Sequence, residues 1–287
     1  MRDIVDIIQE QTRLPGPIQI TDVGAMQIGG YECWHKLIDR GLAILLGFEP
    51  QEEECRRRNA ESKPGCRYLP EALGDGETWP FHHCDYAATS SIYEPNHDFI
   101  RQFNGLSDLM QVVEKSEIRT RRLDDVPEAR QTDFLKLDIQ GAELLLLENA
   151  KETLNNVSLV QTEVSYVPLY KDQPLFADVD QFLRAQGFML HTILEFGKRT
   201  LRPLVINDSP YAYLNQILWS DVVYVKPFWD LPKPASPSTL LKAAILLDVL
   251  FNSCDFAARA FAEYDRFART SLADAYVANL GERAAAA

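Results

Sequence analysis

The chain has few cysteines, and none are paired at a metal-binding spacing. Its five cysteines are scattered through 287 residues, and no CxxC motif occurs. An odd number of separated cysteines makes a poor disulfide framework, and the missing motif argues against a structural zinc site. We therefore expect a reducing, cytoplasmic setting.

The sequence also lacks a long hydrophobic run and an excess of positive charge. No segment approaches the roughly 18 apolar residues of a membrane-spanning helix. The first residues carry acids where a signal peptide has an apolar core. The 42 acids outnumber the 29 bases, and the net charge is −13. Phosphate backbones and anionic membranes repel such a chain, so we expect a small-molecule substrate, no nucleic acid and no membrane span.

The hydrophobic content of 46% is enough to bury a sizeable core. Strand-like and helix-like segments alternate, which favours an α/β fold with a doubly wound, mostly parallel sheet. The predicted strands are 18–23, 43–48, 67–73, 132–137, 158–164, 188–196 and 216–225. The last two are close enough in sequence to form an antiparallel pair, which we expect at one edge of the sheet.

The helices and the remaining segments define the expected domains. Helices are predicted over 31–39, from Glu52 through the run of acids and arginines that follows it, and over 176–186, closed by Gly187. Residues 77–126 are less regular, and we interpret them as an insertion near the site. We expect an N-terminal helical segment (1–16), the α/β domain (17–227), and a linker with a helical C-terminal extension (228–287). The extension, helical throughout 239–280, would pack on the core or form a homodimer.

Residues 132–150 carry the strongest local signal for a site. An apolar strand ends at Asp138, Gly141 follows, and a leucine-rich helix comes next. In open α/β sheets, ligands bind in the crevice at the carboxyl ends of the strands, where Asp138 is expected. The same pattern also fits an ordinary turn in which Asp138 caps the helix. The local sequence leaves both interpretations open.

A set of short motifs follows the predicted strand ends in a fixed order. They are Asp22-Val-Gly24-Ala, Gly47-Phe-Glu49-Pro, Ala72-Leu-Gly74-Asp75, Ser90-Ser91-Ile-Tyr-Glu-Pro-Asn96, Lys136-Leu-Asp138-Ile-Gln-Gly141-Ala-Glu143, Thr162-Glu163-Val and Trp219-Ser-Asp221-Val-Val-Tyr. Together they resemble the FkbM-type methyltransferases, a branch of the class I enzymes that use S-adenosylmethionine. The resemblance covers residues 17–227 and implies the Rossmann-like class I fold with an antiparallel last strand.

The resemblance implies a donor site for S-adenosylmethionine. The residues expected to bind the donor are Asp22, Gly24, Ala25, Glu49, Pro50, Ala72, Leu73, Asp75, Ser91 and Asp138. Within this set Glu49 would accept both ribose hydroxyls, because one carboxylate offers two acceptor oxygens. Asp75 would lie near the adenine, and Asp138 beside the transferred methyl.

The resemblance also implies O-methylation of a hydroxyl on a sugar or secondary metabolite. The expected catalytic residues are Asp138, Glu163 and His83, with Asp138 or a histidine taking the proton of the hydroxyl. Each of these residues has an ordinary structural alternative, such as a turn acid or a surface histidine.

Two departures from the family pattern bear on function. Met26 replaces the usual asparagine of the first loop, and Gln140 replaces a glutamate. Without that carboxylate and a clear fourth ligand, we expect methyl transfer without a metal. One alternative is a non-catalytic binding module that keeps a degenerate cofactor fold. Another is a nicotinamide-dependent oxidoreductase, which the absence of a Gly-x-Gly-x-x-Gly motif disfavours.

Overall fold

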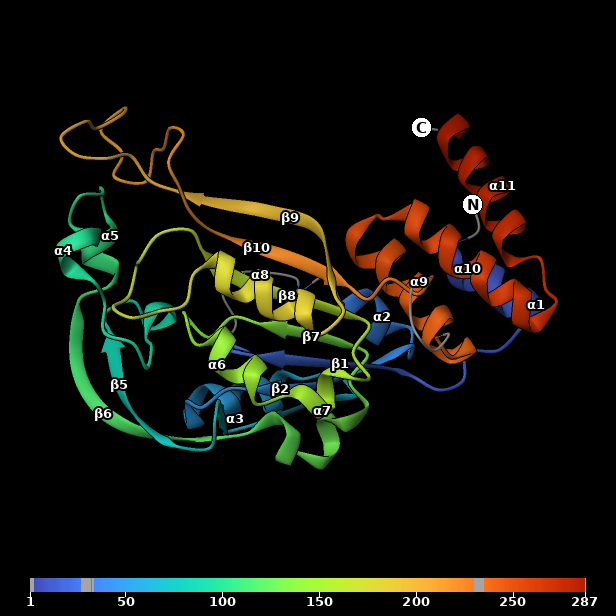
Figure 1. Cartoon of the computed structure of the whole chain (residues 1–287), viewed down its shortest axis with the longest axis horizontal. Coiled ribbons are helices and arrows are strands. Elements are labelled where there is room, and N and C mark those ends of the chain that lie inside the picture. Colours follow the sequence, from blue (N-terminus) through green and yellow to red (C-terminus); the bar gives the residue numbers. More distant parts are fainter. Residues whose placement is uncertain (1–2, 27–31, 33, 230–234, 287) are drawn as a thin grey trace.

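A computed structural model of the chain describes residues 3–26, 32, 34–229 and 235–286, the side chains of 283–286 excepted. A seven-stranded sheet crosses the molecule, with helices on both faces (Figure 1). Its strands, in spatial order, are β3 (Cys66–Leu69), β2 (Ala43–Phe48), β1 (Ile18–Val23), β7 (Phe134–Leu137), β8 (Leu159–Ser165), β10 (Ile217–Val225) and β9 (Met189–Lys198). The predicted class I α/β sheet is confirmed.

The antiparallel pair of β9 and β10 lies at one edge of the sheet, as expected. β10 lies between β8 and β9 and runs antiparallel to both, whereas the other neighbouring strands pair in parallel. Proximity in sequence correctly predicted that β9 and β10 pair. It does not show which of the two lies next to β8, and the sequence left this order open.

A second sheet forms from the less regular part of the chain. It contains β4 (Ala72–Leu73), β6 (Val112–Arg121) and β5 (Thr78–Cys84), in that order. In Figure 1, β5 and β6 curve away from the main sheet beside α4 and α5. The predicted strand 67–73 is therefore two strands in two sheets. The break falls at Pro70, which has no N–H to continue a ladder.

The helices cover the sheet and form the C-terminal part of the chain. They are α1 (Ile4–Gln11), α2 (His35–Asp39), α3 (Glu52–Glu61), α4 (His97–Ile100), α5 (Leu106–Leu109), α6 (Glu143–Glu148), α7 (Lys151–Leu154), α8 (Phe176–Ala185), α9 (Pro237–Phe251), α10 (Cys254–Ala268) and α11 (Leu272–Ala286). The helix predicted over 31–39 begins only at His35, and residues 31 and 33 lie outside the described residues. Gly187 follows α8 with φ +85°, as predicted for a C-terminal cap.

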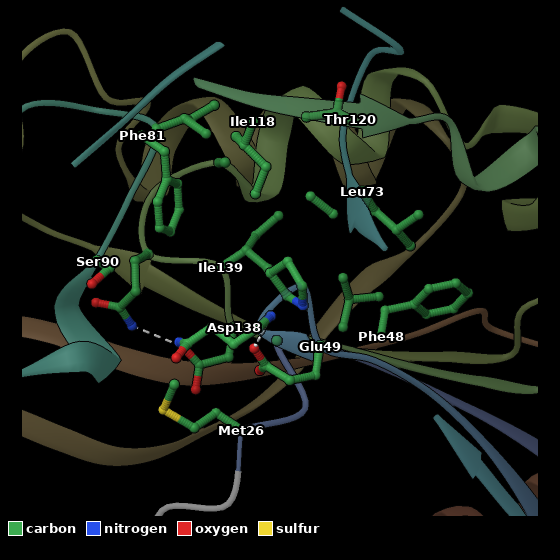
Figure 2. A pocket seen from close by; sticks show the side chains of 18 of the residues that line it. Met26, Phe48, Glu49, Leu73, Phe81, Ser90, Ile118, Thr120, Asp138 and Ile139 are labelled. Carbon is green, nitrogen blue, oxygen red and sulfur yellow. Dashed lines mark hydrogen bonds between the residues drawn. The ribbon is translucent and has the colours of Figure 1, made fainter. Parts of the chain in front are cut away.

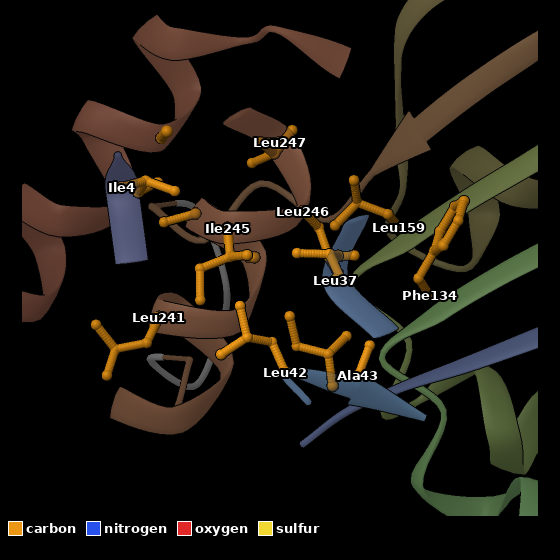
Figure 3. Close-up of a cluster of buried hydrophobic side chains, with 14 of the residues drawn as sticks. Ile4, Leu37, Leu42, Ala43, Phe134, Leu159, Leu241, Ile245, Leu246 and Leu247 are labelled. Atoms are coloured by element: carbon orange, nitrogen blue, oxygen red, sulfur yellow. The ribbon is translucent and has the colours of Figure 1, made fainter. Parts of the chain in front are cut away.

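The C-terminal helices are held to the main sheet by a shared apolar core. Figure 3 shows α9 side chains, among them Leu246, beside Phe134 and Leu159 of the sheet and Ile4 of α1. Lys242 of α9 also forms an ion pair of 2.7 Å with Asp133, just before β7. The extension is not one continuous helix.

Two residues divide the extension into three helices. Asn252 and Arg269 have left-handed backbones, with φ of 52° and 55°, and they end α9 and α10. Among the described residues, no helix has the length and apolar character needed to cross a membrane.

Candidate active site

A cavity opens at the carboxyl ends of β1, β2 and β7. It encloses about 790 Å³, including its opening to solvent. Figure 2 shows Phe81, Ile118 and Thr120 of the second sheet on one side, and Glu49 and Asp138 on the other. The position agrees with the crevice rule for open α/β sheets. Phe81, Ile118 and Thr120 form what we call the roof of the cavity. They lie within residues 77–126, which agrees with the interpretation of this segment as an insertion near the site.

Gly24 allows the ends of β1 and β7 to approach each other. It has φ +79°, and a Cβ built on it would lie 1.8 Å from the backbone oxygen of Asp138. The N–H groups of Gly24 and Ala25 both donate to the carbonyl of Phe48, at 3.1 and 3.0 Å. A side chain at this position would have to displace the backbone, so the loop after β1 requires glycine.

Glu49 places a buried carboxylate on the cavity wall. It follows β2, its side chain is only 2% exposed, and its Oε1 accepts a hydrogen bond from the N–H of Gln51 at 2.8 Å. Burial raises the pKa of Glu49 to about 7. The neighbouring cavity wall is apolar, with Phe48 and Leu73 close by (Figure 2). Glu49 is therefore a buried acceptor beside an apolar surface.

Asp138 belongs to a cluster of carboxylates that surrounds Lys136. The Lys136 Nζ lies 3.4 Å from Asp138 Oδ2 and 3.6 Å from Asp22 Oδ1. Burial alone would lower the pKa of Lys136, but the two aspartates raise it above its usual value. Burial raises the pKa of Asp22 and of Glu163. The carboxyl groups of this cluster thus outnumber its one lysine.

Gln140 connects two acids of the cluster. Its Nε2 donates to Asp138 Oδ1 at 2.9 Å and to Glu163 Oε1 at 3.4 Å, and its Oε1 accepts from the Tyr170 hydroxyl at 3.0 Å. Ser91 Oγ donates to the Gln140 carbonyl at 2.7 Å. These bonds hold Gln140 in its left-handed backbone conformation, with φ 55°.

Glu143 holds the same turn through hydrogen bonds with its backbone. Its Oε1 accepts from the N–H groups of Ile139 and Gly141 at 2.8 and 3.3 Å. Burial raises the pKa of Glu143 to about 7. The turn between β7 and α6 is thus held by its own side chains. No group of three histidine, cysteine or acidic side chains suited to a metal was found within the described part of the chain.

The residues predicted to bind the donor or to act in catalysis divide into three groups. Those that line the cavity are Gly24, Glu49, Pro50, Ala72, Leu73 and Asp138. Four more lie behind the lining without forming part of it: Asp22, Ala25, Ser91 and the predicted catalytic Glu163. Asp75 and His83 form the third group, whose side chains do not line the cavity.

Asp75 and His83 do not line the cavity, although Asp75 Oδ1 accepts a hydrogen bond of 3.1 Å from the hydroxyl of Thr120, which does. Asp75 Oδ1 accepts from the N–H of Glu77 at 2.9 Å and from Trp79 Nε1 at 3.0 Å, so it holds the turn before β5. His83 Nε2 lies 2.8 Å from Ser116 Oγ on β6. The structure does not bring either side chain to Asp138.

Sequence reasoning missed most of the apolar wall. The additional lining residues include Met26, Phe48, Phe81, Ile118, Thr120, Ile139 and Gln140. Alternation along β5 and β6 is the signal that could have found Phe81 and Ile118, because one face of each strand must be covered. The sequence marks Met26 and Gln140 only as departures from a family pattern.

The comparisons with known proteins agree with this geometry. The family model of the methyltransferase FkbM domain matches residues 22–190, more than half of the chain. The 2-O-methyltransferase NoeI of Sinorhizobium fredii is 30% identical over 188 residues, which are 62% of this chain and 74% of NoeI.

Solved structures resemble the chain more distantly. Magnesium protoporphyrin IX methyltransferase from Synechocystis PCC 6803 has a TM-score of 0.36 at 10% identity, over 78% of this chain and 76% of that one. An S-adenosylmethionine-dependent methyltransferase described as putative, from Listeria monocytogenes, has a TM-score of 0.39 at 9% identity, over 77% and 95%. The family assignment does not depend on these two structures. It follows from the match to the family model and from the similarity to NoeI. The chain belongs to the FkbM methyltransferase family and is an S-adenosylmethionine-dependent methyltransferase.

Proposed function

We propose that the chain methylates a hydroxyl group on a neutral small molecule, a sugar or a secondary metabolite. The supporting observation is the acidic cluster at the cavity floor, where Asp138 offers a carboxylate oxygen to an incoming hydroxyl. The printed name of the relative, a 2-O-methyltransferase, also favours an oxygen acceptor. The homodimer through α9 to α11 and the cytoplasmic location remain predictions.

The lining fits S-adenosylmethionine on two counts. Glu49 presents a buried acceptor suited to a ribose diol. Leu73, Phe81 and Ile118 form apolar walls suited to a flat purine. When bound, the donor supplies a methyl group made electrophilic by its sulfonium.

Asp138 is the residue we assign to the acceptor hydroxyl. Its carboxylate would accept the hydroxyl hydrogen bond, orient the oxygen and take the proton as the oxygen–methyl bond forms and the sulfur–methyl bond breaks. Gln140 and Lys136 hold this carboxylate in place through contacts of 2.9 and 3.4 Å. We assign Glu163 a positioning role through Gln140.

Replacing Glu49 with glutamine tests the donor site. We expect Glu49→Gln to weaken S-adenosylmethionine and S-adenosylhomocysteine binding about 100-fold, because hydrogen bonds to a charged acceptor contribute about 1.5–3 kcal/mol each. Isothermal titration calorimetry measures both dissociation constants, with NADH as a negative ligand. Glu71→Gln is a matched control, because Glu71 lines the cavity but already binds Arg121 at 3.0 Å.

The control should change donor affinity less than threefold. A wild-type protein that is folded but binds neither compound would overturn the donor site and favour the binding-module alternative. Tight NADH binding would favour the oxidoreductase. An acceptor screen that finds transfer to nitrogen alone would contradict the oxygen assignment.

Donor binding should depend on pH through Glu49. Its pKa is raised to about 7 in the folded protein, and only the ionised form accepts two hydroxyl hydrogen bonds. Below pH 7 donor affinity should therefore fall about tenfold per pH unit, and above pH 7 it should level off. Calorimetry between pH 5.5 and 8.5 measures this. The dependence should be absent in Glu49→Gln, and a flat wild-type profile would contradict the role.

A further inference from the structure

The loop between β9 and β10 gathers exposed apolar side chains. This β9–β10 loop spans residues 199–216, and in Figure 1 it projects beyond the end of β9, near α4 and α5. Six of the fourteen exposed large apolar side chains in the described residues belong to it. They are Leu201 (49% exposed), Leu204 (52%), Val205 (52%), Tyr211 (57%), Tyr213 (60%) and Leu214 (53%). Such a concentration in one short loop is typical of a surface that binds a partner or a membrane.

The backbone of this loop is held by hydrogen bonds. The buried Asn104, which follows α4, donates from its Nδ2 to the Leu204 carbonyl at 2.7 Å and from its N–H to the Thr200 carbonyl at 3.1 Å. The Thr200 hydroxyl donates to the Ala212 carbonyl at 2.8 Å, which ties the two sides of the loop together. The loop is therefore an ordered projection that presents its apolar side chains to solvent.

Three basic side chains lie at the start of the same loop. Lys198 Nζ lies 5.7 Å from the centroid of the Tyr213 ring, and the Arg199 guanidinium lies 5.7 Å from that of Tyr211, whereas Arg202 is exposed. Aromatic faces orient a cation without neutralising its charge. None of the three forms an ion pair with an acid among the residues that the structure describes. Their charges are thus available to an anionic partner.

The loop is locally positive on an acidic chain. Residues 198–216 contain three bases and one acid, Asp208, whereas the whole chain has a net charge of −13. At physiological ionic strength, charges separated by more than roughly 8 Å are largely screened from each other. The repulsion expected from the net charge is therefore weak at this projecting loop. The partner that fits the loop is both anionic and apolar.

An anionic lipid surface has both properties. Leucine and valine side chains enter the acyl boundary of a bilayer, tyrosines lie at the level of the headgroups, and lysine and arginine reach the phosphates. A projecting loop can reach the depth of about 5–10 Å at which interfacial segments bind. A protein partner usually needs a broad face of about 800 Å², which a single loop does not offer. The shape of the loop therefore favours the lipid surface.

We propose that the β9–β10 loop docks the protein on an anionic lipid surface. Leu204 and Val205 enter the interfacial layer, and Lys198 and Arg202 contact the phosphates of the headgroups. The docking is peripheral, because no helix in the described part of the chain could cross a membrane. The proposal goes beyond the proposed function and does not depend on it, since no residue of the loop lines the donor cavity.

Flotation of the full chain with lipid vesicles tests the docking. The probes are vesicles of phosphatidylcholine alone and vesicles in which about one third of the lipid is phosphatidylglycerol. We expect at least about 30-fold tighter binding to the anionic vesicles, because each basic side chain near such a surface contributes about fivefold. Binding should weaken as the salt concentration rises from about 0.05 M to about 0.5 M, since the Debye length shortens.

Two double variants separate the apolar contribution from the charged one. Leu204→Ser with Val205→Ser should weaken binding to the anionic vesicles at least about tenfold, because the free energy of insertion scales with the apolar area buried. Lys198→Gln with Arg202→Gln should weaken it about 25-fold, from two charges at about fivefold each. The second variant should also lose most of the dependence on salt.

Two matched controls make the same changes elsewhere on the surface. Phe267→Ser with Val277→Ser replaces side chains of α10 and α11 that are 50% and 55% exposed. Arg130→Gln with Lys151→Gln removes two exposed charges outside the loop. Both controls should bind vesicles as the wild type does. Thermal unfolding checks that each variant is folded, and calorimetry should show unchanged S-adenosylhomocysteine binding in all four.

Three results would overturn the proposal. The first is a folded wild type that binds anionic vesicles no more tightly than neutral ones. The second is equal weakening in the loop variants and in their controls. The third is a dimer, detected by analytical ultracentrifugation, that the loop variants dissociate, which would make the loop a contact between two copies of this chain. A wild type that binds the vesicles as expected but binds no S-adenosylhomocysteine would support the docking and reject the donor site alone.

Discussion

Gly24→Ala should abolish donor binding and lower the free energy of unfolding by about 3–5 kcal/mol. The added methyl would lie 1.8 Å from the backbone oxygen of Asp138, and φ +79° is unfavourable for any residue with a Cβ. The loop would have to move away from β7, and with it one wall of the cavity. Urea unfolding and calorimetry with S-adenosylmethionine measure the two effects.

Gly187→Ala separates the clash from the backbone strain. Gly187 has a similar φ of +85°, but a Cβ built on it would have nothing within 4 Å. The substitution should cost only about 1–2 kcal/mol and leave donor binding intact. Equal losses in the two variants would mean that strain alone explains the effect and that the approach of Gly24 to Asp138 is unimportant.

The sheet and the residues at its carboxyl edge could be predicted from the sequence because both signals are local. Buried parallel strands appear as short apolar runs, and the residue after each run lies at the edge where ligands bind. Asp138 was found in this way, whereas Gly24 and Glu49 were assigned with the help of the family resemblance, and the structure brings all three to one cavity. The order of β9 and β10 depends on long-range packing, which adjacency in sequence does not encode.

The roof of the cavity could not be predicted for a different reason. Phe81, Ile118 and Thr120 belong to strands that pair away from the main sheet, so no rule about the edge of the parallel sheet selects them. The family resemblance placed Asp75 near the adenine, and this role stays a prediction. In the structure the carboxylate accepts hydrogen bonds from the Trp79 indole and the backbone of Glu77.

Gln140 shows how a departure from a pattern acquires a physical meaning. The sequence indicated only that a charge was missing. In the structure the amide donates to both Asp138 and Glu163, which a carboxylate at neutral pH could not do. The substitution removes one negative charge from a buried acidic cluster and supplies a donor between two of its members.

Asp138→Asn should reduce kcat at least about 100-fold while S-adenosylmethionine binding changes less than threefold. General-base assistance contributes about 10²–10⁴ in rate, and an amide cannot take the hydroxyl proton. The shape of the side chain is kept, and Lys136 keeps its contact with Asp22 at 3.6 Å. Steady-state kinetics with an acceptor found by screening, and calorimetry with the donor, measure the two quantities.

Asp75→Asn is the matched control for this assignment. The same change is made next to the cavity, but in a turn whose carboxylate binds the backbone of Glu77 and the indole of Trp79. It should lower the unfolding temperature and leave kcat within about threefold, because surface turns contribute mainly to stability. If Asp138→Asn instead lost donor binding as fully as turnover, Asp138 would be a donor ligand only, and the base would have to be sought elsewhere. If both variants kept full turnover, proton transfer to solvent would suffice, and the acidic cluster would act by orienting the acceptor alone.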